Sequence, residues 1–205
     1  FIAAHSVKEF YYWKELALSF KPNIQCIYWP VLSKSKGYWI SEYASYTSLK
    51  KLFNEIESAM KKDNQLYVML DIEKPILWPW LFVINFFTKN KAARLIENFI
   101  HKNRSRLYVC ISHLGLSGNH LQYIPKQRCI IMVYTSFWRW LFNKKMEKFK
   151  RICNKHKSSI IALGCIAKGI VGFEPLLSSN ELKMELKIAK DFGVKHVIIY
   201  RLAGV

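Results

Sequence analysis

Two carboxylates stand at the end of an apolar run that has the pattern of a buried strand. The run LYVMLDIEKP, residues 66–75, contains Asp71 and Glu73 and then breaks at Pro75. Residues two apart on a strand point to the same face, so both carboxylates are expected on one face. Two acids in a partly apolar pocket repel each other, which raises one pKa and leaves the other group ionised. Acid–base catalysis uses this difference, so the spacing predicts a catalytic carboxylate pair.

A structural role for the same pair stays open at this stage. A carboxylate on a parallel strand seldom lies unpaired inside a barrel, and a buried base can neutralise it without any chemistry. Lys168 and Arg201 follow later strand-like runs and are the bases that we would expect in such an ion pair.

Seven apolar runs rich in β-branched and aromatic residues predict strands. They cover residues 1–6, 24–32, 66–73, 106–114, 129–136, 159–167 and 196–203. Continuous apolar character indicates burial on both faces, which is typical of a parallel sheet covered by helices.

Helical periodicity fills most of the intervals between these runs. The predicted helices cover residues 7–20, 46–62, 90–103, 138–155 and 179–192. The last has the clearest ends, because Ser178 and Glu181 form an S-x-x-E capping box and Gly193 ends the helix. Its apolar stripe is predicted to consist of Leu182, Leu186 and Ala189.

The alternation of strands and helices fits either an open doubly wound sheet or a barrel. No G-x-G-x-x-G or Walker loop follows any predicted strand, which removes the main reason to choose a nucleotide-binding open sheet. We therefore predict a single α/β domain over residues 1–205, a (β/α)₈ TIM-barrel-like fold. Because the chain starts at Phe1 inside a strand-like run, we expect a fragment truncated at one or both ends.

Polar residues close several of the predicted strands. Active sites of barrel enzymes lie at the carboxyl ends of the strands, so these residues are candidates for binding substrate. They are His5, His113, Tyr134, Lys168 and Arg201. Two loops add Trp39 and Glu42, within an aromatic segment suited to stacking on sugars, and Glu174 in a Gly-Pro loop.

The chain carries a formal charge of +18. Such a charge can indicate nucleic acid or an anionic membrane. The bases are mostly Lys and are spread along the chain, whereas Arg is favoured for bidentate phosphate recognition, so we do not expect nucleic acid as a partner. The five cysteines form no C-x-x-C pair, and we interpret them as buried thiols of a reducing compartment, the cytoplasm.

The segment ILWPWLFVINFF, residues 76–87, follows directly on the two acids. It is too short to span a bilayer. With Lys89, Lys91 and Arg94 just downstream, it predicts an interfacial contact with an anionic membrane. The alternative is that the segment forms a buried lid or an oligomer contact. If it contacts a membrane, we expect a cytoplasmic protein that associates with the membrane surface.

The strand that ends in LDIE resembles the D-x-E strand of barrel glycoside hydrolases, notably the lysozyme-like muramidases and the chitinase-like family. In those families the Glu is the general acid and the Asp orients substrate or stabilises charge. The resemblance therefore implies that Glu73 is the acid and Asp71 its partner, acting as a hydrolase on a carbohydrate or another small polar substrate, with no cofactor and no metal. The chain departs from the lysozyme-like pattern at His5, where that group has an Asp.

Two other functions remain as alternatives. His5 after the first strand, the acid pair and a second His resemble barrel phosphodiesterases, which use a divalent metal that carboxylate oxygens would bind. The other alternative is a basic barrel without catalytic activity, which docks on an anionic membrane or nucleic acid.

Overall fold

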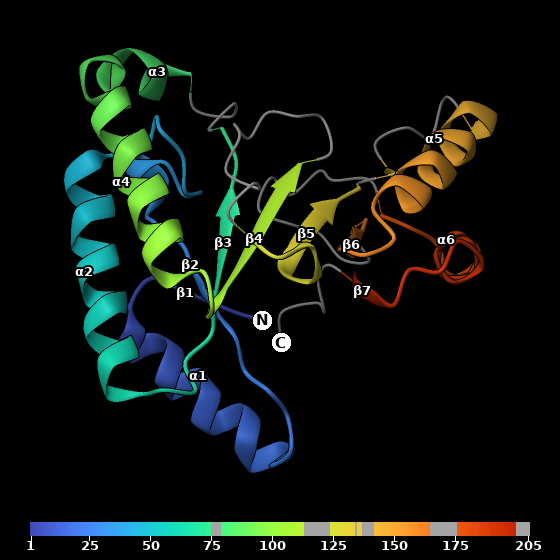
Figure 1. Ribbon diagram of the computed structural model, residues 1–205, viewed down its shortest axis with the longest axis horizontal. Helices are drawn as coiled ribbons and strands as arrows, with labels where there is room; N and C mark the ends of the chain where they lie inside the picture. Colours follow the sequence, from blue (N-terminus) through green and yellow to red (C-terminus); the bar gives the residue numbers. More distant parts are fainter. Residues whose placement is uncertain (75–78, 113–123, 134, 137–141, 165–175, 200–205) are drawn as a thin grey trace. The chain divides into compact units, whose positions relative to one another are not determined.

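The computed structural model describes residues 1–74, 79–112, 124–133, 135–136, 142–164 and 176–199, with the side chains of residues 142 and 143 excepted. Two compact units divide the chain, one built on Phe1–Cys110 and the other on Pro125–Val205. Each unit contains parallel strands that alternate with helices along the chain (Figure 1).

The first unit contains β1 (Ile2–Ala4), β2 (Tyr28–Pro30), β3 (Val68–Ile72) and the start of β4 (Leu107–Ser112). β1 and β2 pair in parallel with Ile2 opposite Tyr28, and β2 and β3 pair in parallel with Tyr28 opposite Val68. β4 continues the order, since the amide of Val68 donates to the carbonyl of Arg106 at 3.0 Å. Neighbours in this sheet are therefore neighbours along the chain.

Three long helices connect and cover these strands. They are α1 (Val7–Phe20), α2 (Tyr46–Lys62) and α4 (Lys89–Asn103). α1 packs on β1 and β2, and α2 contacts both α1 and α4, so the helices lie side by side (Figure 1). The apolar faces of α2 and α4 meet at the stacked rings of Phe53 and Phe99, whose centroids are 4.1 Å apart. The first unit also has the short α3 (Trp80–Ile84) and the 3₁₀ turns η1 (Lys34–Lys36) and η2 (Phe86–Thr88).

The second unit contains β5 (Cys129–Met132), β6 (Ile160–Leu163) and β7 (His196–Ile199), with the 3₁₀ turn η4 (Lys126–Arg128) before β5. β6 pairs in parallel with both neighbours, with Ile160 opposite Ile130 on one side and His196 on the other. α5 (Phe142–Lys155) and α6 (Ser179–Asp191) contact each other beside these strands. Both helices are amphipathic, so each turns an apolar stripe inward and a lysine-rich face outward.

The predicted α/β class and the parallel pairing of the strands are confirmed. Strand order follows chain order within each unit. The strands are shorter than predicted at most ends. Ser6, for example, was predicted as strand but caps α1 by accepting from the amide of Glu9.

Candidate active site

β3 carries the two carboxylates on the side of the sheet that faces away from the helices. Tyr28 is in register with Val68, and the centroid of the Tyr28 ring lies 5.0 Å from that of the Phe10 ring on α1. The face of β3 that includes Val68 therefore lies under the helices. Because strand residues alternate, Asp71 lies on the opposite face, and Glu73, just past the end of β3, continues the same alternation.

Burial keeps both carboxyl groups protonated to higher pH than usual, and the charge of Glu73 adds to this effect at Asp71. Asp71 is 4% exposed, and burial and then the charge of Glu73 raise its pKa well above the ordinary value. Glu73 is partly exposed, and burial raises its pKa to about 7. Native protein near neutral pH therefore holds a proton in this pair, as an acid catalyst requires.

The Asp71 carboxyl group also has an unused hydrogen-bonding atom. Its Oδ1 is buried and has no hydrogen-bond partner within the described part of the chain. A buried polar atom without a partner costs free energy, so such an atom needs an explanation. A bound polar group of a substrate would supply the missing partner.

The loop after β2 lies beside the end of β3 and extends the sheet there. The amide of Ile40 donates to the Asp71 carbonyl at 3.0 Å, and the amide of Glu73 donates to the Ile40 carbonyl at 3.2 Å. Trp39 is next to this bridge in the chain and meets the Tyr38 ring edge-on at 5.3 Å. The backbone of this aromatic loop therefore lies beside the residues that carry the acids.

Glu42 belongs to the same loop but has a cationic neighbour of its own. Its charge acts on Lys89, the first residue of α4, whose Nζ lies 5.0 Å from the centre of the Tyr43 ring. The geometry therefore associates Glu42 with the start of α4.

Cys110 on β4 lies beside the two carboxylates. The sequence pattern did not identify it as a site residue. The thiol is buried, and its pKa is raised well above the ordinary value by burial and then by the charges of Asp71 and Glu73. These interactions place it beside both acids. A thiol with a raised pKa stays protonated at neutral pH, so Cys110 is a neighbour of the pair and is poorly suited to act as a nucleophile.

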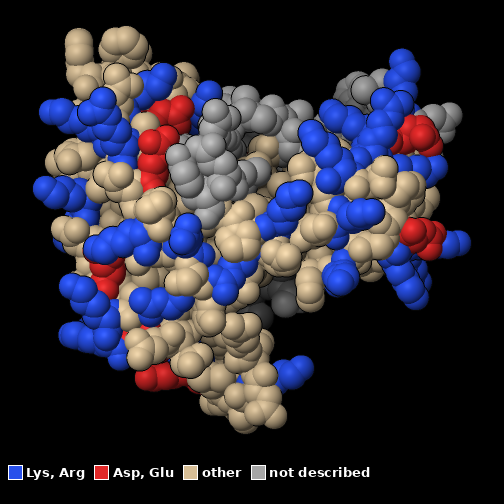
Figure 2. All heavy atoms as spheres, in the orientation of Figure 1, with Lys and Arg blue, Asp and Glu red and all other residues tan. Residues whose placement is uncertain are grey.

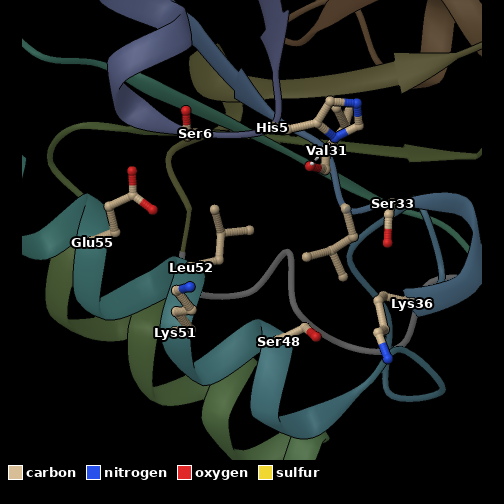
Figure 3. Close-up of a pocket in the computed structure, with 10 residues that line it drawn as sticks. His5, Ser6, Val31, Ser33, Lys36, Ser48, Lys51, Leu52 and Glu55 are labelled. Atoms are coloured by element: carbon tan, nitrogen blue, oxygen red, sulfur yellow. Dashed lines mark hydrogen bonds between the residues drawn. The ribbon is translucent and has the colours of Figure 1, made fainter.

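His5 contributes to a cavity at the carboxyl ends of β1 and β2, against the N-terminal half of α2 (Figure 3). Its Nδ1 lies 3.1 Å from the carbonyl oxygen of Val31, and its backbone amide donates to Glu9. The cavity measures about 390 Å³, and neither Asp71 nor Glu73 lines it. Its lining residues are His5, Ser6, Val31, Leu32, Ser33, Lys36, Ser48, Lys51, Leu52 and Glu55.

The other predicted site residues lie outside the described residues. They are His113, Tyr134, Lys168, Glu174 and Arg201. The structural alternative for the acid pair, an ion pair with Lys168 or Arg201, lies outside them as well.

The second unit contains a buried ionic cluster that the sequence analysis missed. Lys145 on α5 has a fully buried side chain whose Nζ lies 3.6 Å from a carboxylate oxygen of Glu181. Glu185 on α6 is also buried, accepts a short hydrogen bond from the Thr135 hydroxyl and has a raised pKa because of burial. Glu185 lies three residues after Leu182 and four before Ala189, so its place on the predicted apolar stripe was the available signal.

Among the residues that the structure describes, no three His, Cys, Asp or Glu side chains gather in a way that could hold a metal ion. Within the same residues, no helix has both the length and the apolar character that crossing a membrane requires. Comparisons with protein-family models, with curated proteins and with solved structures found no match for this chain.

Proposed function

We propose that this protein is a glycosidase-like hydrolase in which Glu73 is the general acid and Asp71 its partner. The observation that carries the proposal is the proton-holding carboxylate pair at the end of β3. The pKa of Glu73, raised to about 7 by burial, matches the range in which a carboxyl group donates a proton efficiently at neutral pH.

The chemistry assigns a different task to each group. Protonated Glu73, which is partly exposed, reaches the substrate and donates its proton to the oxygen of the bond that breaks. Asp71 is almost fully buried and its pKa is raised as well, so the role that fits it is to orient the substrate through Oδ1, which has no partner among the described residues. Trp39, in the loop that bridges to β3, offers a flat ring for stacking on a sugar.

The proposal extends to a (β/α)₈ TIM-barrel-like fold. It is supported by the parallel strands of each unit, which follow chain order. The acids also come at the carboxyl end of their strand, where barrel enzymes bind substrate. A carbohydrate or another small polar molecule is the substrate class that fits a general acid beside an aromatic loop.

Glu73→Gln tests the proposal directly. The amide keeps the shape of the side chain but cannot donate a proton as an acid, so turnover should fall by 10²-fold or more, on the order of what general acid catalysis contributes. The assay is a screen of chromogenic glycosides, peptidoglycan and chitin, with circular dichroism to confirm that the variant is folded.

The matched control is Glu15→Gln, which removes an exposed carboxylate from α1 and should leave turnover unchanged. The activity of the unmodified chain should also fall as pH rises through about 7, because Glu73 must be protonated to act. If Glu73→Gln turns over substrate as fast as the unmodified chain, Glu73 is not the general acid. If the unmodified chain turns over none of the glycans, the proposed substrate class is wrong.

A further inference from the structure

The turn formed by α3 and η2 exposes an unusual amount of apolar surface. Phe87 is 91% exposed and Val83 is 75% exposed, and Trp80, Ile84 and Phe86 are each at least half exposed. A solvent-facing helix normally carries polar side chains on its outer face. A contiguous exposed apolar patch indicates a surface that binds something.

The opposite side of this turn is fixed to the first unit. Leu81 is buried, the Phe82 ring contacts the Tyr43 ring at 4.4 Å, and the buried Asn85 amide donates to the Tyr43 carbonyl at 3.0 Å. These contacts fix Leu81, Phe82 and Asn85 against the first unit. The other apolar side chains of the turn are therefore held outward, and we call Trp80, Val83, Ile84, Phe86 and Phe87 the apolar tip.

Cations lie next to the apolar tip, and the first acid after it in the chain is Glu97. Residues 80–96 contain Lys89, Lys91 and Arg94 but no Asp or Glu. Lys91 and Arg94 are exposed on α4, which begins where η2 ends. In Figure 2, tan side chains form the corner at which Figure 1 places α3, with Lys and Arg side chains beside them.

We propose that the apolar tip docks on an anionic lipid surface. Trp and Phe rings enter the boundary between headgroups and acyl chains, and flanking Lys and Arg side chains reach the headgroups. The charge of residues 80–96 complements an anionic membrane, because each base near the surface gains attraction from anionic lipid. A protein groove would take the apolar side chains equally well, but it would not by itself require Lys89, Lys91 and Arg94 beside them, although Glu42 near Lys89 offsets part of this charge.

The test measures flotation of the full chain with two kinds of vesicle, one of phosphatidylcholine with phosphatidylserine and one of phosphatidylcholine alone. The chain should bind the first more tightly, and added salt should weaken that binding. Phe86→Ser with Phe87→Ser should lower the affinity by about tenfold or more, because each buried ring contributes on that order. Phe20→Ser is the matched control, since Phe20 is 83% exposed on α1.

The charge contribution is tested with Lys91→Gln and Arg94→Gln together. This double variant should bind phosphatidylserine vesicles less tightly than Lys61→Gln with Lys62→Gln, which removes the same charge from α2. The proposal is overturned if the unmodified chain does not bind vesicles, or if the tip variants bind as tightly as their controls. It is also overturned if the Phe86 and Phe87 variant dissociates a dimer of this chain instead, because the tip would then bind a second copy.

Discussion

Glu73→Gln should change how the stability of the protein depends on pH, independently of any activity. Glu73 has an ordinary pKa of 4.5 and a native pKa of about 7, because burial penalises its charged form. Between these values the native state holds a proton that the unfolded state has released. The free energy of unfolding therefore falls as pH rises through this window and reaches its lowest level above about pH 7.

Each pKa unit corresponds to about 1.4 kcal/mol. A rise from 4.5 to about 7 therefore amounts to a loss of about 3 kcal/mol at most, since Glu73 is partly exposed and interacts with Asp71. Asp71 adds a loss of the same sign, because its native pKa is also raised. For a chain of this size, about 3 kcal/mol corresponds to roughly 10 °C in Tm.

The assay is urea unfolding followed by circular dichroism, at several pH values from about 5 to 8, where the linkage relation predicts the change. The Gln side chain has no proton to lose, so the variant should gain stability relative to the unmodified chain as pH rises. Comparing the two proteins at each pH cancels the contribution of the titrating groups that do not interact with Glu73. Asp71 does interact with it, and losing the Glu73 charge lowers the raised Asp71 pKa, which favours the variant in the same direction as pH rises. Parallel curves for the two proteins would show that Glu73 is not held protonated, and the argument for its acid role would fail with them.

Two further substitutions test the packing around the candidate site and the ionic cluster. Gly37→Ala should lower the free energy of unfolding by about 1–3 kcal/mol, measured by thermal melts. The reasons are that Gly37 has a φ of 118° and that an added Cβ would lie 2.9 Å from the Cβ of Ala44. Gly193→Ala is the control and should lower it less, because Gly193 has a φ of 77° but open space around it. Lys145→Ala should lower the free energy of unfolding, measured with urea, by about 3–5 kcal/mol. The substitution leaves Glu181 and the buried Glu185 without their cation. Lys144→Ala, an exposed neighbour, should stay within about 0.5 kcal/mol, and equal losses for the two lysines would contradict the burial of Lys145.

Periodicity in the sequence was sufficient for most of the fold. The predicted helices at residues 7–20 and 46–62 match α1 and α2, and the Ser178–Glu181 capping box forms at the start of α6 as predicted. Helical amphipathicity and capping are local properties, so the sequence displays them directly. The 3₁₀ turns and α3 were missed, because a helix of about one turn has too few residues to show a period.

The candidate site was predictable only in part. The sequence placed Asp71 and Glu73 on one strand face, because the spacing of two residues is enough for that inference. It did not identify Cys110, which lies on the next strand and meets the acids only when β3 and β4 pair. For segment 76–87 the sequence left open a membrane contact, a buried lid and an oligomer contact. In the part that the structure describes, the residues of the apolar tip are exposed, whereas Leu81 and Asn85 are buried.

What the sequence determined by itself is therefore the strands, the longer helices and the shared face of the acid pair, since these depend on neighbours along the chain. Tertiary structure alone decided which groups lose contact with water. Burial of Asp71 and Glu73 raises their pKa values, burial of Lys145 and Glu185 creates an ionic cluster, and the anchoring of Leu81 and Asn85 holds the apolar tip outward. Solvation depends on every segment that packs around a group, and those segments come from distant parts of the chain.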